Sequence, residues 1–172
     1  QIATLSFDEI KKFSSKFKIF KPDVLFFADS TGTLKAENID PIIKALRTSW
    51  IGDIGIHAHD NMHRALINTL EAHKQGVKWL DSTVNGLGRG PGNTKTEDIV
   101  FELRGINEKN IDFLPLIDLI QNEFSALREK FKWGSNPFYF LSGKNKIHPS
   151  YIQDMLNDNS YRNEDIYASI KE

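Results

Sequence analysis

Two histidines in the sequence have the spacing of a metal-binding pair. His57 and His59 lie two residues apart at the end of an apolar run that includes Ile54 and Ile56. Such a run is typical of a buried strand, in which side chains two residues apart point to the same side. We therefore expect both imidazole rings on one face of the strand end, where they could share a metal ion or each hydrogen-bond a backbone carbonyl.

The composition restricts both the metal and the partners. The chain has 172 residues, of which 40% are hydrophobic and 26% charged, with a net charge of -1 and no cysteine. Without cysteine, a metal would be held by imidazole and oxygen ligands, which suit Mg²⁺, Mn²⁺, Co²⁺ or Zn²⁺. The balanced charge does not indicate nucleic acid or a membrane as a partner, and no apolar run approaches the roughly twenty residues that span a bilayer. We therefore expect a cytoplasmic protein.

Strands and helices are predicted to alternate around the histidine pair. Apolar runs predict three strands, at residues 24–28, at the run that carries the histidines, and at residues 78–84. Amphipathic periodicity predicts helices at residues 6–17, 36–50, 62–75 and 94–104. Capping boxes at Ser6 to Glu9 and Thr94 to Glu97 mark two helix starts, and Gly76 marks a helix end.

Three successive strand–helix units predict an α/β fold with parallel strands. Polar residues follow the carboxyl ends of these strands, where barrels and open sheets alike build their sites. Three parallel strands cannot close a barrel, and an open sheet of three would leave both edges bare. Because the chain also starts at Gln1 rather than at a methionine, we expect it to be a piece of a larger protein.

The pattern changes beyond residue 105, where only helices are predicted. We expect a helix at residues 110–132, a short helix at residues 149–156 and a loosely held end over the last dozen polar residues. Between the helices lies a cluster of aromatic residues that we expect to fill a core: Trp133, Phe138, Tyr139 and Phe140. The sequence thus predicts an α/β part at residues 1–105 and a helical C-terminal region at residues 106–172.

Three motifs carry a resemblance to a known family. They are Ala-Asp-Ser-Thr-Gly at residues 28–32, His-Ala-His-Asp-Asn at residues 57–61 and Asn-Gly-Leu-Gly-Arg-Gly-Pro-Gly-Asn at residues 85–93. In this order and at predicted strand ends, they resemble the signatures of the HMG-CoA-lyase-like (DRE-TIM) metallolyase superfamily. The resemblance covers about residues 5–105 and is strongest to members like 4-hydroxy-2-oxovalerate aldolase.

The resemblance implies both a fold and a chemistry. The fold would be about strands six to eight of a TIM (β/α)8 barrel of the HMGL-like or pyruvate carboxyltransferase type, followed by the helical C-terminal region. The chemistry would be cleavage or formation of a carbon–carbon bond in a 2-oxo acid through a metal-bound pyruvate enolate. The divalent cation, Mn²⁺ or Mg²⁺ with Zn²⁺ or Co²⁺ as alternatives, would stabilise the negative charge that develops on oxygen.

The resemblance also implies roles for single residues. His57, His59 and Asn93 would be the metal ligands, with the carboxamide of Asn93 as a neutral oxygen ligand. Ser30 matches a family residue that binds the substrate carboxylate. Tyr139 is a candidate for the tyrosine that lies over the substrate in the aldolases. By the same pattern, Asp29 would orient the turn in which Ser30 lies. Asp60 and Asn61 would contact and orient the metal ligands without binding the metal themselves.

The residues themselves leave the role of the glycine-rich loop open. Arg89 either binds a substrate carboxylate as a bidentate partner or lies in solvent. The loop could hold a phosphate or bring the backbone close to a ligand, although it lacks the pattern of a P-loop or a dinucleotide fingerprint. We expect His63 and His73 on the helix after the histidine pair, exposed to solvent, and His148 in a local role.

Two departures from the family pattern limit the prediction. HMG-CoA lyase requires a cysteine in the glycine-rich loop, and this chain has none. The Asp-Arg pair of the first barrel strand, which supplies a metal ligand and a catalytic arginine, is also absent, as is the general base. We therefore expect the parent protein to be an enzyme and this chain to be inactive alone.

Three functions remain open at this point. We favour a metal-dependent aldolase, because residues 88–93 and 136–143 look closer to aldolase-like members. The alternatives are an acetyl-CoA-dependent Claisen synthase of the isopropylmalate, homocitrate or citramalate type, and a non-catalytic assembly fragment. A homo-oligomer is expected, with an aldehyde-channelling dehydrogenase as a further partner of an aldolase.

Overall fold

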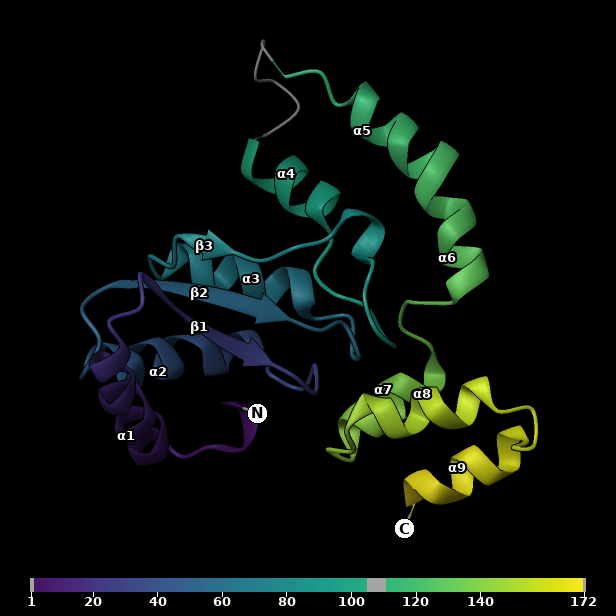
Figure 1. Cartoon of the computed structure of the whole chain (residues 1–172), viewed down its shortest axis with the longest axis horizontal. Helices are drawn as coiled ribbons and strands as arrows, with labels where there is room; N and C mark the ends of the chain where they lie inside the picture. Colours follow the sequence, from purple (N-terminus) through teal and green to yellow (C-terminus); the bar gives the residue numbers. More distant parts are fainter. Residues whose placement is uncertain (1, 105–110, 172) are drawn as a thin grey trace.

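The protein has a three-stranded sheet in which all strands are parallel. The computed structural model describes residues 2–104 and 111–171, and its strands are β1 (Val24–Asp29), β2 (Asp53–Ala58) and β3 (Trp79–Leu80). They lie in the order β1-β2-β3 (Figure 1). The register pairs Ala28 with His57 and Gly55 with Trp79. The predicted α/β fold with parallel strands is confirmed.

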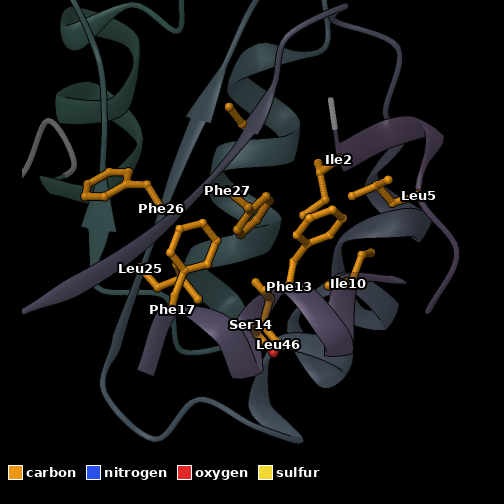
Figure 2. A pocket seen from close by; sticks show the side chains of 11 residues that line it. Ile2, Leu5, Ile10, Phe13, Ser14, Phe17, Leu25, Phe26, Phe27 and Leu46 are labelled. Carbon is orange, nitrogen blue, oxygen red and sulfur yellow. The ribbon is translucent and has the colours of Figure 1, made fainter. Parts of the chain in front are cut away.

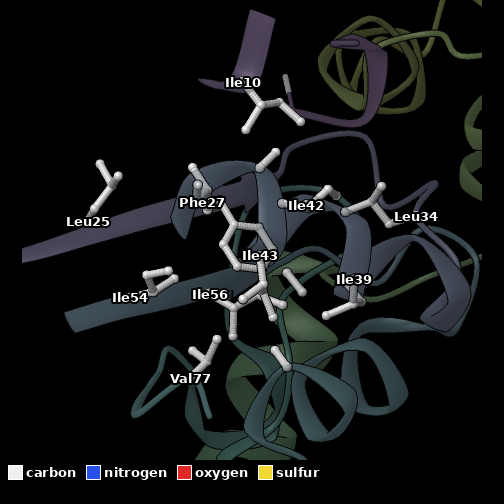
Figure 3. Close-up of a cluster of buried hydrophobic side chains, with 14 of the residues drawn as sticks. Ile10, Leu25, Phe27, Leu34, Ile39, Ile42, Ile43, Ile54, Ile56 and Val77 are labelled. Carbon is white, nitrogen blue, oxygen red and sulfur yellow. The ribbon is translucent and has the colours of Figure 1, made fainter. Parts of the chain in front are cut away.

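Helices cover one face of this sheet. The chain enters through η1 (Ile2–Thr4), α1 (Phe7–Phe17) and η2 (Lys18–Phe20), and the helices α2 (Ala36–Arg47), α3 (Ala65–Lys74) and α4 (Thr96–Arg104) follow the three strands. Apolar side chains of α2 pack on alternate residues of β1 and β2, which gives the main core shown in Figure 3: Leu25, Phe27, Ile39, Ile42, Ile43, Ile54 and Ile56. The opposite face of the sheet, which carries His57, is left for the site.

Local signals place two of the helix ends where the sequence predicted them. The hydroxyl of Ser6 accepts a hydrogen bond from the Glu9 N–H, and the Glu9 carboxylate accepts one from the Ser6 N–H at 2.8 Å, so the capping box forms. At the other end of a helix, Gly76 has φ +84°. Its N–H donates to His73, and the Val77 N–H donates to Ala72, which is the Schellman arrangement.

Three local predictions were wrong. The third strand is only two residues long, because the chain leaves β2 after Asp81 and Thr83 pairs with Lys95 instead. Helix α3 begins at Ala65 rather than at Met62. The Asp60 carboxylate accepts a hydrogen bond from the Ala65 N–H at 3.0 Å. The second capping box does not form, since the Thr94 hydroxyl contacts Thr69 and Ala58 and the Glu97 carboxylate accepts from Asn85.

The described part of the chain after α4 contains helices and connecting loops but no strand. A long helical segment consists of α5 (Leu114–Leu119), a π-helical turn η4 (Ile120–Phe124) and α6 (Ser125–Phe131). The predicted helix start at residue 110 and the predicted boundary at residues 105–106 lie outside the described residues. Three short helices follow: α7 (Pro137–Lys144), α8 (Pro149–Asn157) and α9 (Asn163–Lys171).

The end of the chain is held in place, contrary to prediction. Ile166 and Ile170 of α9 are buried and pack with Tyr139 of α7 and Ile152 of α8 in a second apolar cluster. In Figure 1, α7 and α8 lie beyond the arrowheads of β1 and β2. The Ser135 hydroxyl donates to the Asn61 carbonyl at 2.8 Å, which ties this helical group to the loop after β2. The helical group therefore lies at the carboxyl edge of the sheet.

An apolar groove remains open along the free edge of β1. It has a volume of roughly 300 Å³ and lies between α1 and β1. Figure 2 shows Phe13 and Phe17 of α1 beside it and Phe26 on the side of β1 opposite to Phe27. No helix in the described parts of the chain is long and apolar enough to cross a membrane.

Candidate metal centre

His57 and His59 lie on the same side of β2, as their spacing predicted. His57 is the fifth residue of the strand, and His59 follows its last residue. Their rings meet edge to face, with centroids 4.8 Å apart, and their Nε2 atoms are separated by 3.4 Å. Two nitrogen ligands bonded at about 2.1 Å to one ion with a tetrahedral angle lie about 3.4 Å apart. The pair is therefore spaced for one shared cation.

The other ring nitrogens already have acceptors. His57 Nδ1 lies 2.7 Å from the Asp81 carboxylate, and His59 Nδ1 lies 3.1 Å from the Asp29 carbonyl. A carboxylate and a carbonyl only accept, so both rings carry their proton on Nδ1 when neutral. The two Nε2 lone pairs then face each other with no proton between them. This arrangement is unfavourable by itself and suits a cation, and a partner on the far nitrogen is the usual support of a metal-binding histidine.

The environment of His59 favours its neutral form. Burial lowers the pKa of His59 below its usual value, and the neighbouring His57 lowers it further. The backbone carbonyls of Asp29 and Ser30 only partly oppose this shift. Metal binding requires the neutral imidazole, so the lowered pKa keeps His59 in its ligand form at neutral pH.

Asn93 lies next to this pair and offers an unused oxygen. Its backbone forms an antiparallel bridge with His59, which brings the end of the glycine-rich loop to the end of β2. Its Nδ2 donates to the Leu87 carbonyl at 3.1 Å, while its Oδ1 is buried and accepts no hydrogen bond within the described structure. A buried acceptor without a donor is costly, and a cation would satisfy it.

These three side chains fit a divalent metal as neutral ligands. Two imidazole nitrogens and one carboxamide oxygen match the ligand types of Zn²⁺, Co²⁺ or Mn²⁺. Within residues 2–104 and 111–171, no group of three or more histidine, aspartate or glutamate side chains could hold a metal. The described residues therefore supply a partial and uncharged ligand set.

The turn after β1 lies against the metal centre. The Asp29 side chain is buried, and its two oxygens accept the N–H groups of Thr33 and Leu34 at 3.1 and 3.0 Å. This confirms that Asp29 orients the turn. Ser30 is half-buried in the same turn, directly after the residue whose carbonyl binds His59.

Arg89 and Tyr139 meet the helical group at the carboxyl edge. The exposed Arg89 donates through Nε to Gln153 of α8 at 3.0 Å. Tyr139 is 3% exposed, and its ring lies 3.4 Å from where a Cβ on Gly90 would be. Burial raises the pKa of Tyr139 to about 12, so its phenol remains protonated at neutral pH. The glycine-rich loop thus contacts α8 through Arg89 and α7 through Tyr139.

The remaining histidines lie outside the metal centre. His63 is exposed, as expected, but precedes α3 with φ +56° instead of lying on it. His73 is also exposed and contacts the Val77 carbonyl at the end of α3. His148 accepts the Ser150 N–H through Nδ1 and so caps α8, which is a local role.

Asp81 is the site residue that the sequence analysis missed. It follows β3 directly, and its N–H donates to Ile56, so its side chain lies at the same sheet edge as His57. The rule that polar residues after parallel strands meet at one edge could have identified it. The prediction that the third strand continues to residue 84 places Asp81 inside the strand instead of after its end.

A comparison with known proteins gives this geometry a family. The HMGL-like family model matches residues 4–121 of the chain. The chain belongs to the HMGL-like family. The resemblance seen in the three motifs is thereby confirmed.

Relatives of this HMGL-like chain include enzymes whose names give a 2-oxo acid as the substrate. A 4-hydroxy-2-oxovalerate aldolase from Brevibacillus brevis is 35% identical over 107 residues, which are 61% of this chain and 31% of that protein. An oxaloacetate decarboxylase from Mycobacterium tuberculosis is 36% identical over 104 residues, which are 52% of this chain and 31% of that protein. The chain spans about a third of the length of these curated relatives.

A solved structure also resembles the HMGL-like chain over nearly its whole length. It is the N-terminal domain of a candidate aldolase from Bacteroides vulgatus, with a TM-score of 0.79 and 32% sequence identity. The match covers 95% of this chain and 54% of that one. The similarity therefore extends beyond the sheet to the helices that follow it.

Proposed function

We propose that this chain is part of a divalent-metal-dependent aldolase that acts on 2-oxo acids. The observation that carries the proposal is the approach of two Nε2 atoms to 3.4 Å at a strand end whose His59 bridges to the backbone of Asn93, a residue with an unsatisfied side-chain oxygen. The relative named 4-hydroxy-2-oxovalerate aldolase supports the reaction class. The activity belongs to the whole protein, because the chain spans only about a third of that relative.

The proposal extends to the fold. We assign β1, β2 and β3 to about the sixth, seventh and eighth strands of a TIM barrel, with residues 1–105 as the barrel part. Residues 106–172 form the helical C-terminal region in this assignment. The position of α7 and α8 at the carboxyl edge supports it, because barrel enzymes build their sites at that end.

Each side chain has a part in the proposed site. His57, His59 and Asn93 would hold the cation, which supplies positive charge next to the oxygen on which negative charge develops when the carbon–carbon bond breaks. Ser30 and Arg89 would bind the substrate carboxylate. Tyr139 would donate a hydrogen bond rather than accept a proton, because burial raises its pKa to about 12.

The neutral ligand set defines what the rest of the protein must supply. A site of two imidazoles and a carboxamide needs an anionic ligand for high affinity, and the described residues place none within it. The general base would likewise come from outside them. We therefore propose that this chain alone is inactive, and that Mn²⁺ or Mg²⁺ is the metal, with Zn²⁺ or Co²⁺ as alternatives.

The surroundings of the proposed enzyme follow from this chemistry. An aldolase of this type releases pyruvate and an aldehyde, and a dehydrogenase partner would remove the aldehyde. We also propose a homo-oligomer in the cytoplasm, with no nucleic-acid or membrane partner.

The experiment is an assay of the full-length protein for pyruvate release from 4-hydroxy-2-oxo acids with added Mn²⁺. We expect activity in the wild type and a loss of at least about a hundredfold in His57→Ala, because one of the few ligands is removed. His73→Ala on the outer helix α3 is the matched control and should retain activity. Equal activity of His57→Ala and the wild type would refute the proposed role of His57.

Decarboxylation of a 2-oxo acid is the second candidate, because the relative from Mycobacterium tuberculosis is named oxaloacetate decarboxylase. Breaking the bond to a carboxylate builds negative charge on the same oxygen, so the same residues serve both reactions. Comparing oxaloacetate with 4-hydroxy-2-oxovalerate in the assay separates the two candidates. Consumption of acetyl-CoA would instead reveal a Claisen synthase.

A further inference from the structure

Asn85, the first residue of the glycine-rich loop, is held from three sides. It is 8% exposed and has a left-handed backbone, with φ +52°. Its N–H donates to the Glu97 carboxylate at 3.0 Å, and its carbonyl accepts the Trp133 indole N–H at 2.9 Å. Its side-chain Oδ1 accepts from the Arg128 guanidinium at 3.4 Å. A residue in this backbone conformation needs such support to persist.

Two of these contacts come from the segment after the sheet. Arg128 lies on α6, and its Nε also donates to the Trp133 carbonyl at 3.2 Å, so the two residues form one unit. Trp133 is 5% exposed. The next residue, Gly134, donates its N–H to the carbonyl of Gly90 at 2.9 Å, which fixes the middle of the loop. We call Arg128 and Trp133 the loop clamp.

The clamped loop carries the carboxamide of Asn93. The Asn93 N–H donates to the Gly86 carbonyl at 3.2 Å, and its Nδ2 donates to the Leu87 carbonyl at 3.1 Å. Gly92 lies between the clamp and the start of the loop, since a Cβ there would be 2.5 Å from the Gly86 oxygen and 3.6 Å from the Trp133 ring. A shift of Asn85 would therefore move the carbonyls that orient Asn93.

We propose that Arg128 and Trp133 are positioning residues that hold the Asn93 carboxamide beside His59 for metal binding. The clamp thus links the helices after the sheet to the metal centre at its edge. Neither residue touches the metal or the substrate in this role. The inference rests on the proposed metal centre, although the order of the loop can be measured without any metal.

The test uses this chain and the variant Trp133→Phe, which keeps an aromatic ring but removes the N–H to Asn85. We expect hydrogen exchange of residues 85–93 in the metal-free chain to become about tenfold faster, because one buried hydrogen bond is lost. We also expect Co²⁺, followed by its visible absorption, to bind about tenfold more weakly. Trp79→Phe is the matched control, since it removes an exposed indole bond to Asp53 and should change neither measurement.

The outcomes separate the clamp from the metal centre. Unchanged exchange and unchanged Co²⁺ affinity in Trp133→Phe would overturn the inference, even if the melting temperature falls. If the wild type binds no Co²⁺, or His57→Ala binds it equally well, the proposed metal centre fails while the exchange result still decides whether the clamp orders the loop. Should Trp133→Phe not fold, Arg128→Lys gives the same test. Lysine keeps the positive charge but lacks the planar guanidinium that donates to both the Trp133 carbonyl and Asn85 Oδ1.

Discussion

Hydrogen-bonding groups at the ends of the neighbouring strands decide the chemistry of His57 and His59. The strand aims both rings to one side, but the Asp81 carboxylate and the Asp29 carbonyl fix which nitrogen is free. A carboxylate behind a ligating histidine orients the ring and raises its basicity. Asp81 therefore belongs to the proposed metal centre as a support of His57, not as a ligand.

We predict that Asp81→Asn weakens Mn²⁺ binding to this chain by about 10- to 100-fold. The carboxamide still fits next to His57 Nδ1 but lacks the negative charge that makes the ring a better ligand. Isothermal titration calorimetry measures the change. Asp53→Asn, at the opposite end of β2, is the control and should bind Mn²⁺ like the wild type, and equal affinities for both variants would contradict the role of Asp81.

The pKa of His59 predicts how stability depends on pH. Burial lowers this pKa below the usual 6.5, so the unfolded chain binds the proton more tightly than the folded chain. The contribution of His59 to the free energy of unfolding is thus full above pH 6.5 and is lost as the pH falls through the lowered pKa. Urea denaturation measures the free energy of unfolding between pH 7.5 and pH 5. This free energy should fall less with pH in His59→Gln than in the wild type and in the control His73→Gln.

At the scale of elements, the glycine-rich loop depends on backbone that only glycine can provide. Gly92 combines φ +79° with the carbonyl of Gly86 directly in the path of a side chain. Gly76, at the end of α3, has a similar φ of +84° but open space around it. Both glycines have a strained backbone conformation, but only Gly92 has another backbone atom where a side chain would lie. Comparing the two therefore separates the cost of the backbone strain from the cost of the clash.

We predict that Gly92→Ala destabilises the chain by about 3 kcal/mol or more, because strain and a clash with a backbone atom add. Gly76→Ala should cost only about 1–2 kcal/mol, which is the penalty of the left-handed backbone alone. Urea unfolding of both variants measures the difference. Equal costs would mean that the loop moves aside freely, in conflict with a clamped loop.

At the scale of the whole molecule, much apolar surface lies at the open side of the sheet. Phe26 is 46% exposed and Trp79 is 51% exposed on the two edge strands of the described sheet. The groove along β1 adds Phe13 and Phe17 of α1 to this surface (Figure 2). Large exposed apolar patches and bare strand edges promote association.

We predict that the isolated chain associates with itself as its concentration rises, and that Phe26→Lys shifts it towards the monomer. A charge on the free edge of β1 opposes pairing of edges. Analytical ultracentrifugation over a concentration series measures the association. Ile51→Lys is the control, because Ile51 is exposed in a loop away from this groove, and a similar effect of both variants would argue against the edge of β1 as the contact.

The sequence by itself determined the features that depend on neighbouring residues. Apolar runs in successive strand–helix units predicted the parallel strands, and the period of two along a strand predicted the common side of His57 and His59. The caps at Ser6 and Gly76 were also placed correctly. These signals are local, because strand periodicity and helix capping involve residues only a few positions apart. The motifs added the family, which the comparison confirmed.

Only the tertiary structure decided which distant groups meet. Asp81 reaches His57 across 24 residues, and Trp133 reaches Asn85 across 48. The short β3, the different partners of Glu97 and the docked helix α9 have the same origin. Each depends on packing between elements that are far apart in the chain, and such packing overrides local preference because buried polar groups must find partners wherever the fold places them.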